Sequence, residues 1–231
     1  AASHEDVLSA ASDEDALIES IGEGPSDPLE RLNRVFFWIN RGIEVAVLDP
    51  VSQIYGMVVP DPAKRAVRRA FTNLNSAGVF ANDVMQCEGE DAMATALRFA
   101  INSTVGLAGL FDLASELGLA RHESDFGETL WRHGEPDGPY LFLPVLGPAN
   151  ARDAIGRTID GLMRPEFYLL GPIERIAIDA TDGLTLREGH LDGLNALRQS
   201  SLDFYSAFRS AYVMSRDAEL RRRSEVSARS R

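Results

Sequence analysis

The sequence predicts an all-α protein. Apolar residues recur at spacings of three and four through most of the chain, and few stretches alternate with a period of two. Two Asp-Pro pairs stand where long helices would begin. The 231 residues are 45% hydrophobic, enough to bury the core of one large domain or two small ones. No repeat with a period of 20–50 residues is visible, so nothing indicates a solenoid.

Composition narrows the class of function. The formal net charge of −12 argues against a general role in nucleic-acid binding. The single cysteine, Cys87, excludes a disulfide within the chain and a zinc cluster built on thiolates. No run of 18 apolar residues is present, so no conventional transmembrane helix is expected.

The first strong element is predicted to start at Asp27, with Asp27 as the N-cap and Pro28 at the first helical position. Apolar residues follow at helical spacing as far as the Asp49-Pro50 pair. Residues 35–39 are apolar at five successive positions and cover every side of the helix. Such a turn is either deeply buried or faces lipid.

Further helices are predicted to start at Asp61 and to cover 73–85, 89–104, 125–133, 150–163, 172–187, 191–197 and 202–220, with Asn150 as a cap. Residues 1–26 are acidic and weakly periodic, so they are assigned to a tail or linker. The helical domain is placed at 27–217, and the basic segment 218–231 is predicted to be disordered beyond the last helix.

Basic side chains cluster near the start of the Asp61 helix. Lys64, Arg65, Arg68 and Arg69 lie close together there. The cluster is either a solvated basic face or a surface that meets anionic lipid headgroups.

No recognisable catalytic motif is present. The sequence lacks a Gly-x-Ser-x-Gly elbow, a phosphate-binding glycine loop and a zinc-protease helix, and its four histidines are scattered. We therefore expect a protein that is not an enzyme and needs no metal or other cofactor.

Three apolar segments lie where the chain has Gly, Pro or charges on either side, at 36–39, 105–114 and 140–146. The last is too broken by Gly and Pro for a long helix or a central strand, and too apolar for a solvated loop. These segments either belong to an ordinary core or lie within a membrane interface, where irregular backbone must pack on protein or line a wet cavity.

Several ordered motifs resemble the MlaA/VacJ family of outer-membrane lipoproteins over about residues 27–216. They are Asp-Pro-Leu-Glu-Arg-Leu-Asn-Arg-Val-Phe-Phe-Trp-Ile-Asn at 27–40, Phe-Thr-Asn-Leu at 71–74, Arg-Phe-Ala-Ile-Asn-Ser at 98–103, Asp-Phe-Gly-Glu-Thr-Leu at 125–130, Gly-Pro-Tyr-Leu-Phe-Leu-Pro at 138–144 and Gly-Pro at 147–148. Asp203-Phe204-Tyr205 and the segment from Arg209 to Arg216 are similar to the closing helix of the family.

The resemblance implies a helical ring in the inner leaflet of the outer membrane of a Gram-negative bacterium, with apolar Gly/Pro-rich connectors and an amphipathic channel. It implies transport of phospholipids that have strayed into the outer leaflet to a soluble periplasmic carrier, which maintains lipid asymmetry without bond chemistry. The ligand is then a phospholipid, and the protein partners are that carrier and a trimeric porin.

Three sets of residues are candidates for roles in this function. Candidates to line the lipid path are Asn33, Asn40, Arg98, Arg132, Arg152 and Asp153. The two asparagines lie seven apart on one helix face, where they either line the path or bond to a neighbouring loop. Candidates for membrane contact are Phe36, Phe37, Trp38, Leu107, Leu110, Tyr140, Phe142 and Val145. Gly127, Pro139, Pro144 and Gly147 are the candidates for shaping the backbone.

The sequence departs from the family pattern at two places. The family carries a lipid-bearing cysteine at the mature N-terminus, where this sequence has Ala1, so either the cysteine was trimmed or this member is not lipidated. The family motif Asn-Leu-x-x-Pro lacks its proline here, since Asn73-Leu74 is followed by Asn-Ser-Ala, and a looser turn is expected.

Two other functions remain open on the sequence alone. One is a soluble helical binding module that uses the apolar segments as its core or as a partner interface. The other is a lipid-modifying enzyme whose site has no recognisable motif.

Overall fold

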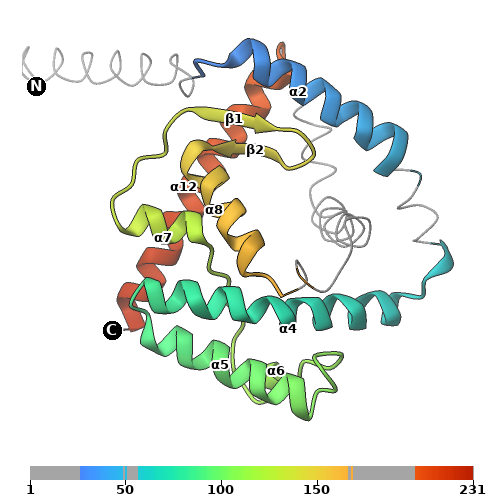
Figure 1. The fold of residues 1–231 in the computed structure, drawn as a ribbon, viewed down its shortest axis with the longest axis vertical. Coiled ribbons are helices and arrows are strands. Elements are labelled where there is room, and N and C mark those ends of the chain that lie inside the picture. Colours follow the sequence, from blue (N-terminus) through green and yellow to red (C-terminus); the bar gives the residue numbers. More distant parts are fainter. Residues whose placement is uncertain (1–26, 49, 51–56, 166–167, 169–200, 231) are drawn as a thin grey trace, which may run out of the picture.

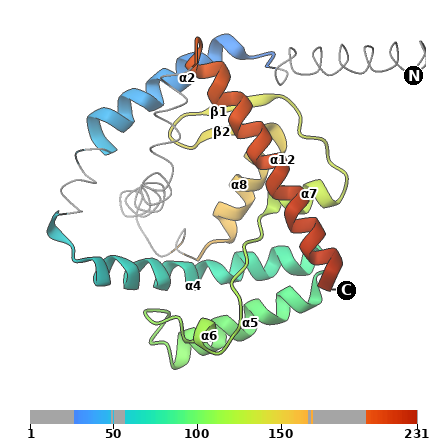
Figure 2. The same ribbon diagram turned by 180° about the vertical axis from the view of Figure 1, so that it is seen from behind.

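The computed structural model describes residues 27–48, 50, 57–165, 168 and 201–230. The elements are α2 (Glu30–Ile43), the π-helix η1 (Glu44–Leu48), α4 (Asp61–Met85), α5 (Gly89–Thr104), α6 (Leu113–Glu116), α7 (Phe126–Arg132), β1 (Tyr140–Leu143), β2 (Gly147–Asn150), α8 (Ala151–Met163) and α12 (Phe204–Ser230). α2 and α4 lie on opposite sides of a ring-like frame, and α8 and the β-hairpin lie between them (Figure 1). Seen from behind, α12 runs diagonally from beside α2 towards the α4–α5 pair (Figure 2).

Two of the predicted helix starts are capped by their side chains. Asp125 accepts a hydrogen bond from the Glu128 amide at 2.8 Å and begins α7, and Asn150 accepts from the Asp153 amide at 2.7 Å and begins α8. The prediction that Asp27 caps the first helix is wrong, because α2 begins at Glu30. The Asp27 carboxylate is occupied by tertiary partners instead.

α4 is one continuous helix, so the looser turn expected near Asn73 is wrong. No proline removes a backbone donor there. Ser76 stays in the helix and donates its hydroxyl to the Thr72 carbonyl at 3.3 Å. The helix therefore passes through the site of the family turn.

α12 is longer than predicted, because it continues to Ser230 where 218–231 was expected to be disordered. Arg223 donates to Glu128 at 2.8 Å and to Glu219 at 2.6 Å, and Arg221 pairs with Asp217 at 2.8 Å. These ion pairs hold the basic segment in the helix. The helices predicted over 172–187 and 191–197, and the acidic segment 1–26, lie outside the described residues.

The fold is mostly helical as predicted, but it also contains a β-hairpin that the sequence did not suggest. β1 and β2 are antiparallel, with Tyr140 opposite Asn150 and Leu143 opposite Gly147. Both strands are edge strands of this two-stranded sheet, so Pro148 is tolerated.

Aromatic side chains form the main apolar core between α2, the hairpin and α12. Phe37 is 5% exposed, and its ring packs edge-on against Phe142 at a centroid distance of 5.3 Å and against Tyr205 at 5.5 Å. Tyr140 completes the buried cluster. This core joins segments more than 100 residues apart and fixes the upper part of the frame in Figure 1.

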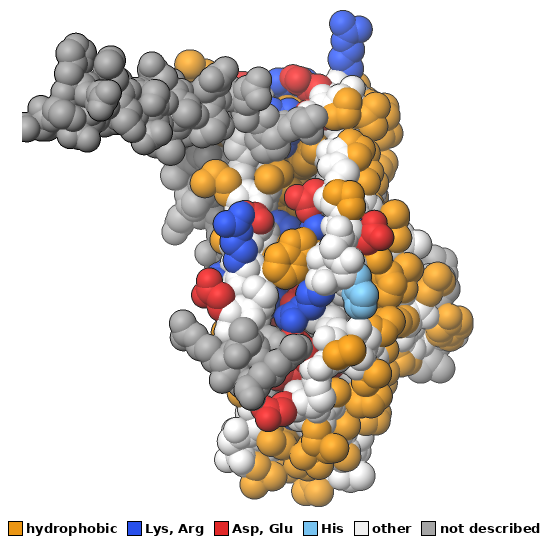
Figure 3. Space-filling view, turned by 90° about the vertical axis from the view of Figure 1, so that its left-hand side faces the viewer, with side chains coloured by type: hydrophobic (Ala, Val, Ile, Leu, Met, Phe, Trp, Pro, Cys, Tyr) orange, Lys and Arg blue, Asp and Glu red, His pale blue; other side chains and the backbone are white. Residues whose placement is uncertain are grey.

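Elsewhere the usual distribution of residue types is inverted. In the described part of the chain, fourteen polar or charged residues are buried against eight hydrophobic ones, and 28 large hydrophobic residues are exposed. α5 shows the pattern within one helix, because it buries Thr95, Arg98 and Asn102 and exposes Met93 and Leu97. Seen edge-on, hydrophobic side chains gather along one face of the flattened molecule, on the right in Figure 3. A contiguous apolar face over a polar interior is typical of a protein that contacts lipid or a large partner surface.

Candidate functional site

Asn33 and Asn40 hold the hairpin against α2. Asn33 donates to the Tyr140 carbonyl at 3.0 Å and accepts from the Phe142 amide at 2.8 Å. Asn40 makes the same pair of contacts nearer the hairpin tip. It donates to the Leu143 carbonyl at 2.9 Å and accepts from the Val145 amide at 2.7 Å. Of the two roles considered for these asparagines, their contacts match bonding to a neighbouring loop.

The hairpin tip needs this support because its backbone is strained. Val145 has a φ of 68°, which is unfavourable for a β-branched residue, and Gly147 has a φ of 77°. Pro144 and Val145 are exposed at the tip, whereas the carbonyl of Pro139 at the other end accepts from the Ala151 amide at 3.0 Å. Asn40 therefore fixes an apolar turn that projects from the frame.

The three arginines predicted to line the lipid path are all paired with carboxylates. Arg98 forms a two-pronged contact with Asp112 at 2.9 and 3.0 Å. Arg132 pairs with Glu128 at 2.8 Å, and Arg152 pairs with Asp137 at 2.5 Å. At most 15% of each arginine side chain is exposed. All three arginines therefore take part in ion pairs, and a lipid phosphate that bound one of them would have to displace a carboxylate; their place on the lipid path stays a prediction.

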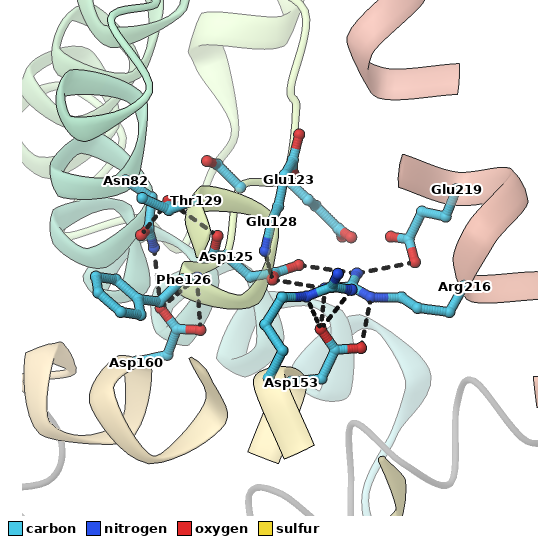
Figure 4. Close-up of polar contacts among 12 residues, drawn as sticks. Asn82, Glu123, Asp125, Phe126, Glu128, Thr129, Asp153, Asp160, Arg216 and Glu219 are labelled. Atoms are coloured by element: carbon cyan, nitrogen blue, oxygen red, sulfur yellow. Dashed lines mark hydrogen bonds and ion pairs between the residues drawn. The ribbon is translucent and has the colours of Figure 1, made fainter. Parts of the chain in front are cut away.

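The sixth predicted path residue, Asp153, belongs to a network that ties α12 to α7 and α8 (Figure 4). Arg216 of α12 donates to Asp153 at 3.0 Å and to both oxygens of Asp125 at 2.7 and 3.0 Å. Burial alone would raise the pKa of Asp125, but the hydrogen bonds and charge of Arg216 outweigh it and hold that pKa below the usual value. We call Arg216, Asp125 and Asp153 the α12 clamp.

Two glycines allow the helices at the clamp to approach. A Cβ on Gly156 would lie 2.4 Å from the Gly127 nitrogen, and a Cβ on Gly127 would lie 2.6 Å from the Asp153 carboxylate. The predicted role of Gly127 in shaping the backbone is thus a matter of close packing between α7 and α8. Asp160, one turn along α8, accepts from the Phe126 amide and Asn82.

The predicted membrane-contact residues divide into two groups. Phe37, Tyr140 and Phe142 are buried in the aromatic core, and Phe36 packs against it, so these predictions are wrong for the three buried residues. The apolar residues 35–39 surround α2 and cannot all face outward, because one side of this helix packs against the hairpin. The exposed members are Trp38 at 60%, Leu107 at 60%, Leu110 at 38% and Val145 at 64%.

A cavity of about 590 Å³ opens among the polar faces of the helices. Its wall includes α4 residues between Arg68 and Val79, buried polar residues of α5 and the segment from Arg121 to Asp125. The end of α8 and, from α12, Glu219 and Arg223 complete it. Arg98 is the predicted path residue on this wall, and Arg152 lines a second cavity of about 160 Å³ beside Tyr140 and Tyr212.

His122 anchors one wall of the larger cavity. Its Nε2 lies 2.9 Å from Asp83, which is fully buried, and 3.3 Å from the Thr95 hydroxyl. The hydrogen bond with Asp83 raises the pKa of His122. In the part of the chain that the structure describes, no group of three His, Cys, Asp or Glu side chains is placed to hold a metal ion.

Sequence reasoning did not find the partners that make this interior. The sequence analysis did not single out Asp83, Gln86 or Asp112, and the four scattered histidines showed no pattern that pointed to His122. The one available signal was polar spacing: Thr95, Arg98 and Asn102 recur at three and four on α5, and they form its buried face.

Fold and site define a helical protein with a polar, ion-paired interior and an apolar outer face, a class suited to the boundary between lipid and water. None of the helices in the described ranges is both long and apolar enough to cross a membrane. The family model "MlaA lipoprotein" matches residues 25–219, so the chain belongs to the MlaA lipoprotein family.

Named and solved relatives agree with this assignment. The chain is 32% identical over 199 residues to the Intermembrane phospholipid transport system lipoprotein MlaA of Escherichia coli K12, covering 84% of this chain and 78% of that protein. It is 31% identical over 195 residues to an uncharacterised protein of Rickettsia felis, with the same coverage. A solved structure described as "Structural basis for maintenance of bacterial outer membrane lipid asymmetry" superimposes with a TM-score of 0.68 at 30% identity, covering 87% of this chain and 99% of that one. The predicted family and mostly helical, ring-like fold are confirmed.

Proposed function

We propose that this chain is an outer-membrane component of intermembrane phospholipid transport and maintains the lipid asymmetry of that membrane. The observation that carries the proposal is the inverted burial: an exposed apolar face over an interior of polar and charged groups. A phospholipid crosses a leaflet slowly because its charged headgroup must enter hydrocarbon. A protein that is apolar outside and polar inside lowers that cost.

The proposal includes a location and a path. The apolar face contacts the acyl chains of the inner leaflet, and the exposed tips at Leu107 and Val145 enter the lipid. Phospholipids that have strayed into the outer leaflet pass through an amphipathic channel bounded by the frame. They are handed to a soluble periplasmic carrier, and a trimeric porin holds the protein in the membrane. A lipid-bearing N-terminal cysteine, as in the family, would add an anchor.

The test is restoration of asymmetry in a Gram-negative strain that lacks its own family member. The full chain is expressed with a lipoprotein signal, and aminophospholipid in the outer leaflet is labelled with a membrane-impermeant amine reagent. We expect the labelling to fall to the level of the parent strain. Labelling that stays at the level of the deletion strain, with the protein present in the outer membrane, would contradict the proposal.

Mass spectrometry of the protein purified in mild detergent separates the other two functions. The transport protein should carry intact phospholipid. A stable monomer that needs no detergent and carries no lipid would indicate a soluble binding module. Release of lysophospholipid or free fatty acid during incubation would indicate an enzyme.

A further inference from the structure

The chain between α6 and α7 lies against α4 and α5 without forming a helix or a strand (Figure 2). We call residues 119–125 the strap. Its last five residues line the larger cavity. Among the residues that the structure describes, 120–124 make no backbone–backbone hydrogen bond. The strap is therefore held in place by side chains.

Three attachments hold the strap from the inside. Near its start, Arg98 of α5 donates to the Leu119 carbonyl. Near its end, Gln86 donates to the Ser124 hydroxyl at 2.9 Å. The middle attachment is His122, whose Nε2 contacts both α4 and α5. Of the three, it is the one that contains a group titrating near neutral pH.

The hydrogen bonds around His122 place a proton on Nε2. Thr95 donates its hydroxyl to Asp83 Oδ2 at 2.8 Å, so its oxygen can only accept from His122, 3.3 Å away. The same Asp83 oxygen lies 2.9 Å from Nε2. Nε2 therefore carries a hydrogen, and the proton that charges the ring is gained and lost at Nδ1.

His122 faces a group of carboxylates. Asp83 of α4 is fully buried, and its second oxygen has no hydrogen-bond partner in the described chain. Asp91 and Glu88, at the start of α5, also act on the ring, and Glu88 is itself paired with Arg132. The hydrogen bond to Asp83 is the largest cause of the raised pKa of His122, against an opposing effect of burial. The charged ring is thus the ion-pair partner of Asp83.

The other charges near the strap are paired with one another. Arg98 is bonded to both oxygens of Asp112 at 2.9 and 3.0 Å. On the strap itself Arg121 pairs with Glu123 at 3.3 Å, and Arg223 of α12 lies 3.5 Å from Glu123. Arginine and carboxylate side chains ordinarily titrate far from neutral pH. These pairs therefore keep the ends of the strap attached when its middle is released.

We propose that the charge on His122 latches the strap over α4 and α5, and that loss of this charge releases the middle of the strap and opens the larger cavity. A neutral ring leaves the Asp83 carboxylate buried without a compensating charge, which is unfavourable. Lifting the strap lets water reach that carboxylate. Because the strap is part of the cavity wall, the same movement opens the polar interior. The latch does not depend on which ligand the cavity holds.

The direction of the effect follows from the pKa of His122, which is raised while the strap is closed. Below about pH 6.5, the ordinary value for histidine, the ring is charged whether the strap is closed or open, and the latch has its full strength. As the pH rises through the raised pKa, the charge and the latch are lost together. Acid therefore keeps the cavity closed, and alkaline pH opens it.

Trypsin reports on the strap directly, because Arg121 lies within it. The full chain in detergent is digested between about pH 6 and about pH 9. Each rate of cleavage after Arg121 is divided by the rate for a free peptide of the same sequence, so the effects of pH and of neighbouring residues on the protease cancel. A charge-assisted and a neutral hydrogen bond differ by about tenfold in an equilibrium constant. We expect the relative rate of the parent to rise about tenfold across this range.

Three variants show whether His122 causes this rise. His122→Gln and Asp83→Asn each remove one charge of the pair and should abolish the pH dependence. If one of them fails to fold, the other still decides. His133→Gln is the control, because His133 contacts the Thr129 carbonyl at the end of α7 and does not line the cavity. It should keep the pH dependence of the parent.

Access to the cavity is measured separately, with Val79→Cys in a chain that carries Cys87→Ser. Val79 lines the cavity one turn before Asp83 on α4. At about pH 6 a water-soluble thiol reagent should modify the new thiol faster when the chain also carries His122→Gln. At about pH 9 the two chains should react at similar rates. Comparing chains at one pH removes the effect of pH on the thiol itself.

Four outcomes would overturn the proposal. A relative cleavage rate that does not change with pH in the parent would remove the latch. A pH dependence that persists in His122→Gln or in Asp83→Asn would assign it to other groups, and its loss in His133→Gln would show a general effect of removing a histidine. Equal labelling of Val79→Cys with and without His122→Gln at about pH 6 would show that the strap does not control access to the cavity.

Discussion

Replacing Arg216 by Met should destabilise the protein by about 3 kcal/mol. The substitution keeps the length of the side chain and leaves the carboxylate of Asp153, 4% exposed, without its main partner. Breaking a buried ion pair costs about 3–5 kcal/mol. We expect the lower end, because Tyr212 still donates to Asp153 at 3.2 Å and Arg152 lies 3.3 Å from it.

Thermal unfolding followed by circular dichroism in detergent measures this effect. At about 2–4 °C per kcal/mol for a chain of this size, Tm should fall by roughly 6–12 °C. Arg221→Met is the control on the same helix, because Arg221 is 71% exposed in its pair with Asp217 and such pairs contribute about 0–1 kcal/mol. If the two variants unfold at the same temperature, the α12 clamp does not stabilise the frame.

Three further predictions follow from single contacts. Gly156→Ala should destabilise the protein by about 1–3 kcal/mol, because the added Cβ would overlap the backbone of α7. Gly161→Ala is the control: an added Cβ there has nothing within 4 Å, so the change should be neutral or stabilise by up to about 1 kcal/mol. Equal Tm values for the two variants would refute the close approach of α7 and α8. The pKa of His122 is raised in the folded protein, so its contribution to stability is complete below about pH 6.5 and is lost as the pH rises through the folded pKa. His122→Gln should remove this part of the pH dependence of Tm, and an unchanged dependence would contradict this role of His122. Asn40→Ala should lower the free energy of unfolding by about 1–3 kcal/mol and speed proteolysis at the hairpin tip. Unchanged proteolysis there would show that Asn40 does not hold the tip.

Local chemistry made several elements predictable from sequence. Asp125 and Asn150 are followed by apolar residues at helical spacing, and both begin helices with their side chains as caps. The same logic failed at Asp27. Its carboxylate accepts from Asn33 and from Arg209, which is 182 residues away, so tertiary contacts replaced the local cap. Nothing in the flanking sequence signals such a partner.

The hairpin was not predictable from its own sequence. Tyr-Leu-Phe-Leu is apolar at every position, so the alternation of a strand is hidden, although the burial does alternate along β1. Its position depends on Asn33 and Asn40, which supply donors and acceptors from more than 100 residues earlier. The family resemblance located the segment but assigned Tyr140 and Phe142 to the membrane rather than to the core.

The interior was predicted as a set of polar residue types but not as pairs. Arg98 and Arg152 were chosen because a guanidinium can pair with a lipid phosphate through two hydrogen bonds. Their partners are Asp112 and Asp137, fourteen and fifteen residues away, and the geometry that brings them together is set by loops without a periodic pattern.

The inverted arrangement of apolar and polar residues is the centre of this account, and Trp38 tests it most directly. The sequence has two tryptophans, so Trp131→Phe leaves Trp38 as the single fluorophore, and Trp38 is 60% exposed on α2. In vesicles whose acyl chains carry bromine, the account predicts strong quenching of its fluorescence and a blue-shifted emission. Unquenched, red-shifted emission from vesicle-bound protein would show that this face meets water, and would contradict the account.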